Sequence, residues 1–323
     1  MKLPDLNNYL NKILVFYYPD KAGYWNSITR CCVTQRPVEL GNYYLDFSSK
    51  AFYPEQFSEN GIPLFNYKNY HKVEQPVVIA QYALGLSSLL SKDNFNNPEF
   101  EKKFINTANW FAKNKQPFRD GVGWFINILH PHYGLNAPWI SAMAQGEAIS
   151  VLTRAAKISK DDLYEKIAID ALVPFEYDVA EGGIVNYFNS IPVYEEAPST
   201  PKTMAVLNGF IFSLFGLYDL YLLNKNSKAN SLFNKGIESL IKLLPYYDIK
   251  RWSNYFLYEY PKKYYSSYTY HILVTEQLKA LYVLTGESIL NDYAQKWDKY
   301  SKNFIKKNIA LFQKVFFSNK INS

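Results

Sequence analysis

Residues 137–150 read A-P-W-I-S-A-M-A-Q-G-E-A-I-S, and residues 206–220 read V-L-N-G-F-I-F-S-L-F-G-L-Y-D-L. Apolar residues dominate both stretches, which predicts two buried helices. Between them, residues 194–201 read Y-E-E-A-P-S-T-P. Prolines stiffen this acidic loop, because proline fixes φ and cannot continue a helix. A rigid acidic loop between buried helices is either a platform for a functional site or a well-capped connection with an acidic surface.

Helical patterns extend outward from these two stretches over most of the chain. From Pro76 onward apolar residues recur near a helical period, and proline or capping residues mark several helix starts. We expect helices at residues 76–90, 98–111, 139–157, 162–172, 203–223, 229–244, 270–285 and 288–308. Short connections within successive pairs and long aromatic connections between pairs are typical of an α/α toroid, a barrel of helical hairpins whose loops build the site at one end.

The first part of the chain does not follow this pattern. Turn signals alternate there with short aromatic or β-branched stretches at residues 27–30 and 43–47. We expect irregular structure with a few short strands, a hairpin and one short helix. The predicted protein is therefore mainly α, with an irregular or β-hairpin segment at residues 1–73 and an α/α-barrel domain at residues 74–323.

Composition narrows the classes of partner. Tyrosine is abundant, with 29 copies in 323 residues. Its apolar body and polar tip suit a carbohydrate site, although compositional bias would give the same number. The net charge of +6 favours an anionic partner. The Lys and Arg residues form only short clusters, which argues against nucleic acid.

Cysteines and hydropathy predict the cellular context. Cys31 and Cys32 are adjacent and poorly placed to pair, so a disulfide scaffold is excluded. The N-terminal residues contain no apolar run long enough for a signal peptide or membrane span. Residues 203–223 are long enough to span a membrane, but Asn208, Ser213 and Asp219 favour a buried core helix. We expect a soluble, cytoplasmic protein.

Two groups of residues could carry chemistry. Glu195 and Glu196 could supply a glycosidase-type acid, because burial raises the pKa of a carboxyl, but no second acid is identifiable. His130 and His132 form an H-x-H without a third ligand, so we predict no catalytic metal. The chain also has no phosphate-binding loop and no serine-hydrolase motif.

Tyrosines gather late in the chain, at Tyr255, Tyr258, Tyr260, Tyr264, Tyr265, Tyr268 and Tyr270, and His271 follows them. A cationic neighbour can lower the pKa of a tyrosine, which allows its phenolate to abstract a proton. For any single tyrosine, aromatic packing is the better explanation.

Four motifs in order carry a family resemblance. They are S-A-M-A-Q-G-E-A-I-S, Y-E-E-A-P-S-T-P, V-L-N-G-F-I-F-S-L-F-G-L-Y-D-L and L-L-P-Y-Y-D. Together they resemble the C-terminal catalytic domain of the D-glucuronyl C5-epimerases, which act in heparan sulfate and heparin synthesis. A segment at residues 79–82 also resembles the start of that domain, and the likeness covers most of residues 63–300.

The resemblance implies an α/α-barrel and a reaction that inverts C5 of glucuronate within a polymer, giving iduronate. The family's catalytic glutamate falls on Glu196, its two catalytic tyrosines on Tyr255 and Tyr270, and a substrate-binding asparagine on Asn208. By the same resemblance we expect further substrate contacts from Ser141, Met143, Gln145, Glu195, Tyr268, His271 and Arg251. An anionic, glucuronate-containing polysaccharide is the implied partner, and dimers in the family imply a homodimer.

The implied chemistry suits these residue types. The C5 hydrogen is α to a carboxylate, so its removal builds charge that the site must stabilise. One group takes the proton from one face of the sugar and another returns it to the opposite face. Tyr255 and Tyr270 could be this pair, while Glu196 could orient a tyrosine or exchange the proton itself. No redox cofactor is required.

Three positions depart from the family pattern. A family tyrosine is Ala197 here, an arginine that would hold the substrate carboxylate aligns with Tyr258, and an asparagine aligns near Glu276. Arg251, Lys262 or Lys263 could replace the arginine. These changes leave two rivals to the epimerase: a polysaccharide lyase that begins with the same proton abstraction, and a non-catalytic glycan-binding protein.

Overall fold

Helices make up most of the chain in the computed structural model, which describes residues 6–21, 23–67, 71–258 and 264–317. Ten α-helices lie in these residues, one more than the eight helices and the short N-terminal helix expected. They are α1 (Leu6–Tyr17), α2 (Pro76–Lys92), α3 (Pro98–Asn114), α4 (Ala142–Ser159), α5 (Asp162–Asp170), α6 (Leu207–Asn224), α7 (Ser227–Tyr247), α8 (Tyr268–Thr285), α9 (Ser288–Lys302) and α10 (Phe304–Phe317). The predicted fold class, mainly α, is confirmed at this level.

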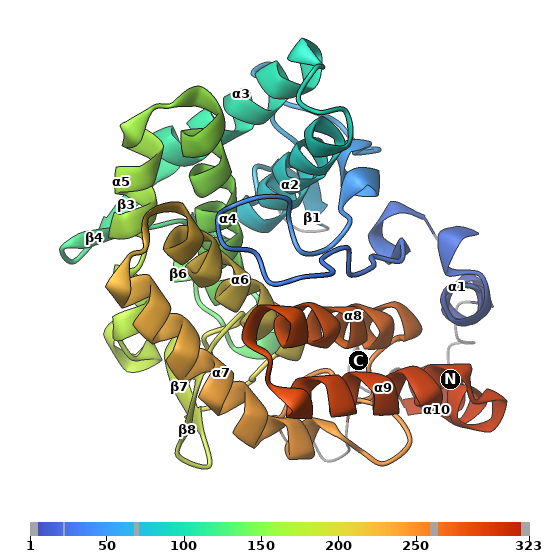
Figure 1. The fold of residues 1–323 in the computed structure, drawn as a ribbon. Coiled ribbons are helices and arrows are strands. Elements are labelled where there is room, and N and C mark those ends of the chain that lie inside the picture. The colour runs from blue at the N-terminus through green and yellow to red at the C-terminus, as the bar shows by residue number, and fades with distance from the viewer. Residues whose placement is uncertain (1–5, 22, 68–70, 259–263, 318–323) are drawn as a thin grey trace.

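Successive helices pack against each other in pairs, and the pairs form an inner and an outer layer. The helices α2, α4, α6 and α8, called the inner helices below, contact one another in that order. Each packs against the helix that follows it, and α3, α5, α7 and α9 lie on the outside (Figure 1). The N-terminal segment lies against both ends of this row, because residues 48–51 pack on α2 and Cys31 binds Glu276 of α8. Closure of the helices into a toroid stays a prediction.

Strands are short and pair only locally in the described residues. Four two-stranded antiparallel sheets form. They are β1–β2 (Phe65–Tyr67, His71–Val73), β3–β4 (Gln116–Phe118, Gly121–Gly123), β5–β6 (Phe125–Ile126, Trp139–Ile140) and β7–β8 (Val185–Phe188, Ile191–Tyr194). Strands expected at residues 27–30 and 43–47 are replaced by a single bridge between Cys31 and Leu45. Residues 43–45 are all buried, so this stretch packs into the core instead of alternating like a half-exposed strand.

Two helix boundaries differ from the prediction for local reasons. The helix expected from Trp139 begins at Ala142, because Trp139 pairs with Ile126 and the Ser141 hydroxyl caps the helix by accepting a hydrogen bond from Ala144 N. The helix expected over residues 288–308 divides at Asn303, whose side chain accepts a hydrogen bond from Lys306 N and starts α10.

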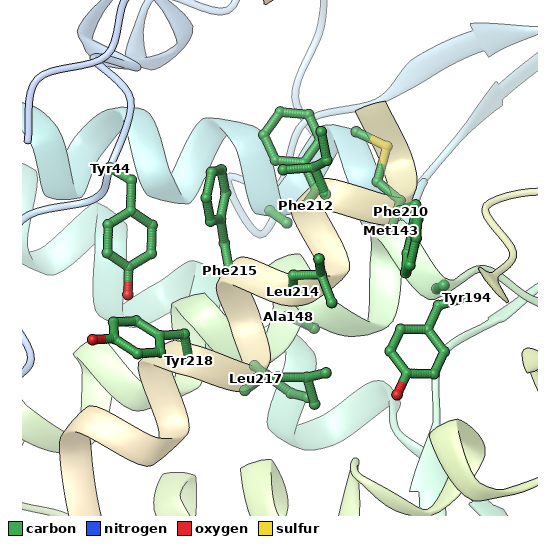
Figure 2. Packing of buried hydrophobic residues seen from close by; sticks show 14 of the residues in the cluster. Tyr44, Met143, Ala148, Tyr194, Phe210, Phe212, Leu214, Phe215, Leu217 and Tyr218 are labelled. Atoms are coloured by element: carbon green, nitrogen blue, oxygen red, sulfur yellow. The ribbon is translucent and has the colours of Figure 1, made fainter. Parts of the chain in front are cut away.

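The core is centred on the contact between α4 and α6. A Cβ added to Gly216 would lie 2.1 Å from the carbonyl oxygen of Gly146, so the two backbones approach at a distance that only glycine permits. Aromatic side chains surround this contact: Phe215 lies beside Tyr44 and Tyr218, with a centroid distance of 4.8 Å to Tyr44 (Figure 2). The two stretches that opened the sequence analysis are therefore neighbours in space.

We expect Gly216→Ala to lower the free energy of unfolding by about 3 kcal/mol, the upper range for overpacking a core. The added methyl group would meet backbone, which cannot rotate away as a side chain would. Thermal and denaturant unfolding measure the effect. Gly41→Ala is the matched control, because a Cβ there meets nothing within 4 Å. Equal stability of the two variants would contradict the close α4–α6 contact.

Candidate active site

A cavity of about 250 Å³ lies at the N-terminal ends of α4, α6 and α8. Its wall combines the acidic loop with all four inner helices and with residues from the N-terminal segment. Five residues that the resemblance assigned to the site lie on this wall: Ser141, Met143, Glu196, Asn208 and Tyr270. The loops at one end of the helical pairs thus build the cavity, as the helical-hairpin pattern predicted.

Glu196 is held against the first turn of α6. The Asn208 amide donates to Glu196 Oε2 at 3.4 Å, and the Gly209 N–H is a further donor to the carboxylate. A Cβ on Gly209 would lie 2.1 Å from Glu196 Oε2, so glycine is required for this approach. Burial nevertheless raises the pKa of Glu196 to about 7, against the opposing effect of the Gly209 hydrogen bond. Glu196 can therefore exist in both protonation states near neutral pH.

The neighbouring carboxyl, Glu195, points away from the cavity and does not line it. It is fully buried, and both of its oxygens accept hydrogen bonds from Ala205 N, at 3.1 and 2.9 Å. Burial raises the pKa of Glu195 to about 8. Its hydrogen bonds to Ala205 N hold residues 204–206 in place at the start of α6.

Tyr255 and Tyr270 form a pair at the cavity edge. Their ring centroids are 4.9 Å apart at an interplanar angle of 70°. Tyr270 lines the cavity and is 40% exposed, whereas Tyr255 lies behind it and is not on the wall. Burial raises the pKa of both phenols, that of Tyr270 to about 12, and a hydrogen bond from Tyr255 favours the ionised form of Tyr270. Tyr255 is thus placed to stabilise the phenolate form of Tyr270.

Lys50 is a site residue that sequence reasoning missed. Among the described residues it is the only lysine or arginine on the cavity wall. Its ammonium donates to Tyr24 O at 3.1 Å and lies over the Tyr24 and Trp25 rings, 4.4 and 5.5 Å from their centroids. Burial lowers the pKa of Lys50 to about 8, and Glu147 opposes the shift. No motif surrounds Lys50 in the sequence, and only packing of residues 48–51 on α2 brings it to the cavity.

Four other residues that were predicted to contact the substrate lie away from the cavity wall. Three of them instead pack or form hydrogen bonds inside the fold. Gln145 is buried and donates to the carbonyls of Val122 and Ala171, both at 2.9 Å. His271 Nε2 donates to Trp297 O at 3.0 Å, and its Nδ1 lies 2.7 Å from the Ser253 hydroxyl. Tyr268 packs near Trp252, and Arg251 is exposed.

The positions that depart from the family pattern have distinct surroundings. Ala197 lines the cavity, where a larger phenol would reduce its volume. Tyr258 packs under Lys202, whose ammonium lies 4.9 Å from the ring centroid. Glu276 accepts hydrogen bonds from Cys31 N at 2.9 Å and Arg30 at 3.2 Å, so it anchors the N-terminal segment to α8. Tyr260, Lys262 and Lys263 lie outside the described residues.

The histidine pair does not assemble a larger cluster in the part of the chain that the structure describes. His130 lines the cavity and stacks on Tyr133 at a centroid distance of 4.5 Å, while the side chain of His132 lies outside the description. Within the described ranges no three His, Cys, Asp or Glu side chains come together in a metal-binding arrangement. Across those same ranges, every helix is too short or too polar to cross a membrane.

The fold and the cavity define a class of protein. Its members would combine helical hairpins with one cavity that holds a carboxyl with a pKa near 7, a lysine and a phenol, and with a second phenol packed against the first. This set of groups is suited to moving a proton next to an anionic group.

The chain belongs to the D-glucuronyl C5-epimerase C-terminal family, whose model matches residues 120–299. D-glucuronyl C5-epimerases are isomerases. The matched range contains Glu196, Asn208, Tyr255 and Tyr270, whereas Lys50 lies outside it.

Two proteins from distant organisms are similar to this chain. The chain is 35% identical to the D-glucuronyl C5-epimerase of Caenorhabditis elegans over 219 residues, which are 61% of this chain and 35% of that protein. It is 28% identical to an uncharacterized protein of Methanocaldococcus jannaschii over 179 residues, which are 54% of this chain and 57% of the archaeal protein. The chain thus spans about a third of the nematode enzyme's length and somewhat more than half of the archaeal protein's.

Proposed function

We propose that the protein is a uronate C5-epimerase that converts D-glucuronate to L-iduronate residues within a heparosan-like polysaccharide. The observation that carries the proposal is the meeting of Glu196, Tyr270 and Lys50 on one cavity wall. Family membership supports the reaction type. We also propose that residues 74–323 form a closed α/α barrel and that residues 1–73 complete its cavity.

In the proposed reaction Lys50 binds the carboxylate of the target uronate. Removal of the C5 proton delocalises charge onto that carboxylate, so the ammonium stabilises the transition state more strongly than the ground state. Lys50 thereby fills the role of the family's arginine. Tyr258 stands at the position of that arginine in this chain, and Lys50 is far from it in the sequence.

Glu196 and Tyr270 exchange the proton in this proposal. Glu196 is the base that is available near neutral pH, because its pKa is about 7, whereas Tyr270, with a pKa of about 12, keeps its proton. Neutral Tyr270 is the matching acid for the other face of the sugar, and Tyr255 stabilises its phenolate by donating a hydrogen bond. In the reverse direction the two groups exchange roles.

We expect Lys50→Met to lower kcat/KM by about 10–100-fold, the equivalent of one lost hydrogen bond to a charged group. Methionine keeps the apolar stem but removes the charge that would meet the uronate carboxylate. Steady-state kinetics and thermal unfolding should be measured together. Lys302→Met, on the exposed side of α9, is the control. A normal kcat/KM in Lys50→Met would remove Lys50 from the proposed site.

Proton NMR in D₂O tests the function directly. The protein is incubated with desulfated heparosan and with N-sulfated heparosan. Loss of the glucuronate H5 signal together with new iduronate signals would establish epimerisation. A 4,5-unsaturated uronate signal would identify a lyase, and binding without any exchange would identify a glycan-binding protein. Without binding or exchange on either polymer, the heparosan-like substrate is wrong.

A further inference from the structure

A row of buried polar side chains extends from the cavity into the space between the inner helices. Glu147, Ser150 and Arg154 follow one another at intervals of three and four residues on α4, so they share one face of the helix. All three are buried, and Tyr43 from the N-terminal segment lies beside them, 2% exposed. Glu147 Oε2, Ser150 Oγ, Arg154 Nε and the Tyr43 hydroxyl have no hydrogen-bond partner among the described residues.

Four such atoms in one row call for an explanation. Buried polar groups in proteins are nearly always hydrogen-bonded, either to protein or to ordered water. The four groups are also mutually close. The Arg154 guanidinium lies 5.1 Å from the Tyr43 ring centroid. Burial raises the pKa of the Tyr43 phenol, Glu147 raises it further, and Arg154 and Ser150 lower it, so all three side chains are near the phenol. A row of this kind is a place for bridging water.

The row connects two cavities. At the first end, Gln81 lines the active-site cavity and donates to Glu147 Oε1 at 3.2 Å. At the second end, Arg154 lines another cavity, of about 500 Å³, near the C-terminal end of α4. The wall of that cavity includes Phe95, which is 50% exposed, so it is open to solvent. From Glu147 to Arg154 the helix rises only about 10 Å, a distance that a few waters bridge.

The charges along the row are balanced. Arg154 donates to both oxygens of Asp219, at 2.6 and 3.1 Å, and Tyr44 donates to the same carboxylate at 2.6 Å. The guanidinium charge is therefore neutralised where it meets the row. Burial, reinforced by the nearby Glu196, raises the pKa of Glu147 well above its usual value and so favours its protonated form. A protonated carboxyl can release a proton from one oxygen while it accepts another.

We propose that Glu147, Ser150 and Tyr43, with water between them, form a proton path from the second cavity to the active-site cavity. The inference rests on the proposed function. After each epimerisation Glu196 has gained the C5 proton and Tyr270 has lost its own. Before the next turnover Glu196 must release a proton to water and Tyr270 must take one from water. The path lets this exchange proceed after the converted uronate has left the site, while the rest of the polymer still covers the outer mouth of the active-site cavity.

Steady-state kinetics of Glu147→Gln and Tyr43→Phe in the full chain test the path. Regeneration follows product release, so its slowing lowers kcat and spares kcat/KM. We expect kcat to fall about tenfold or more in both variants while kcat/KM stays within about twofold of wild type. Tyr43→Phe removes a hydroxyl that has no hydrogen-bond partner in the described part of the chain, so it should fold normally and keeps the test decisive if Glu147→Gln misfolds. The matched control is Tyr194→Phe, whose hydroxyl donates to Leu232 O away from the row, and its kcat should be unchanged.

The outcomes separate the path from the function. Wild-type kcat in Tyr43→Phe would overturn the path, and so would an equal fall of kcat and kcat/KM, because the hydroxyl would then act on the chemical step or on the fold. In either case the wild-type protein still exchanges uronate H5, and the proposed function stands. A wild-type protein that exchanges H5 in no uronate polymer would overturn the function and the path together.

Discussion

Tyr270→Phe is expected to abolish measurable epimerisation, with kcat/KM lowered by about 10³-fold or more, within the range for loss of a general acid or base. Phenylalanine keeps the ring that packs 4.9 Å from Tyr255 but removes the oxygen that faces the cavity. Polymer binding should persist, because Lys50 and the remaining wall are intact. Loss of turnover with retained binding therefore assigns the effect to chemistry.

A tyrosine on the same helix provides the control for this variant. Tyr282 is 38% exposed, close to the 40% of Tyr270, but does not line the cavity. Tyr282→Phe should leave kcat/KM and affinity unchanged. NMR exchange of glucuronate H5 and equilibrium binding to the polymer give both quantities. Undiminished exchange in Tyr270→Phe would remove this phenol from the mechanism.

Glu196→Gln is expected to lower kcat/KM by at least about 10²-fold, because the amide cannot accept the C5 proton. The pH profile carries a second expectation. Only the carboxylate form of Glu196 is a base, so kcat/KM of the wild-type protein should rise with pH through about 7, the pKa that burial imposes. That rising limb should be missing from the residual activity of the variant.

The same substitution should stabilise the fold at higher pH. Burial raises the folded-state pKa of Glu196 above the ordinary 4.5, so the folded protein binds more protons than the unfolded chain between those values. The stabilising contribution is complete below pH 4.5 and is lost as pH rises through about 7. Glutamine carries no charge, and Glu196→Gln should therefore unfold at a higher temperature than wild type at pH 8.

Glu238→Gln is the matched control, since Glu238 is exposed on α7 and away from the cavity. Its activity, pH profile and melting temperature should match those of the wild type. If Glu196→Gln kept a near-normal rate, Glu196 would be a structural residue at the start of α6. A melting temperature at pH 8 below that of wild type would show that its carboxylate stabilises the fold.

Much of the secondary structure could be predicted from local patterns. The starts of α2 and α3 follow proline at the first helical turn, and the predicted core helix over residues 203–223 is α6. Predictions were wrong where tertiary packing overrides a local signal. Residues 43–47 are rich in aromatic strand formers, yet the core surrounds them and leaves only one bridge, at Leu45.

The candidate site could likewise be predicted only in part. The motifs carry Glu196 and Asn208 to the cavity, but the same motifs also contain residues that hold the fold. Glu195 and Gln145 differ from true cavity residues only in the direction of their side chains, which depends on hydrogen bonds to Ala205 and Val122. Motif membership cannot separate the two roles, because adjacent residues in one motif point in different directions.

By itself the sequence determined the helical pairs, the mainly α class and the motifs that place the chain in its family, because these depend on residues close together along the chain. Only the tertiary structure decided which motif residues reach the cavity and which cation joins them. Lys50 lies far from Glu196 in sequence, and its ammonium reaches the cavity through contacts of residues 48–51 with α2. Such contacts form when distant segments bury a shared apolar surface, and no local pattern records them.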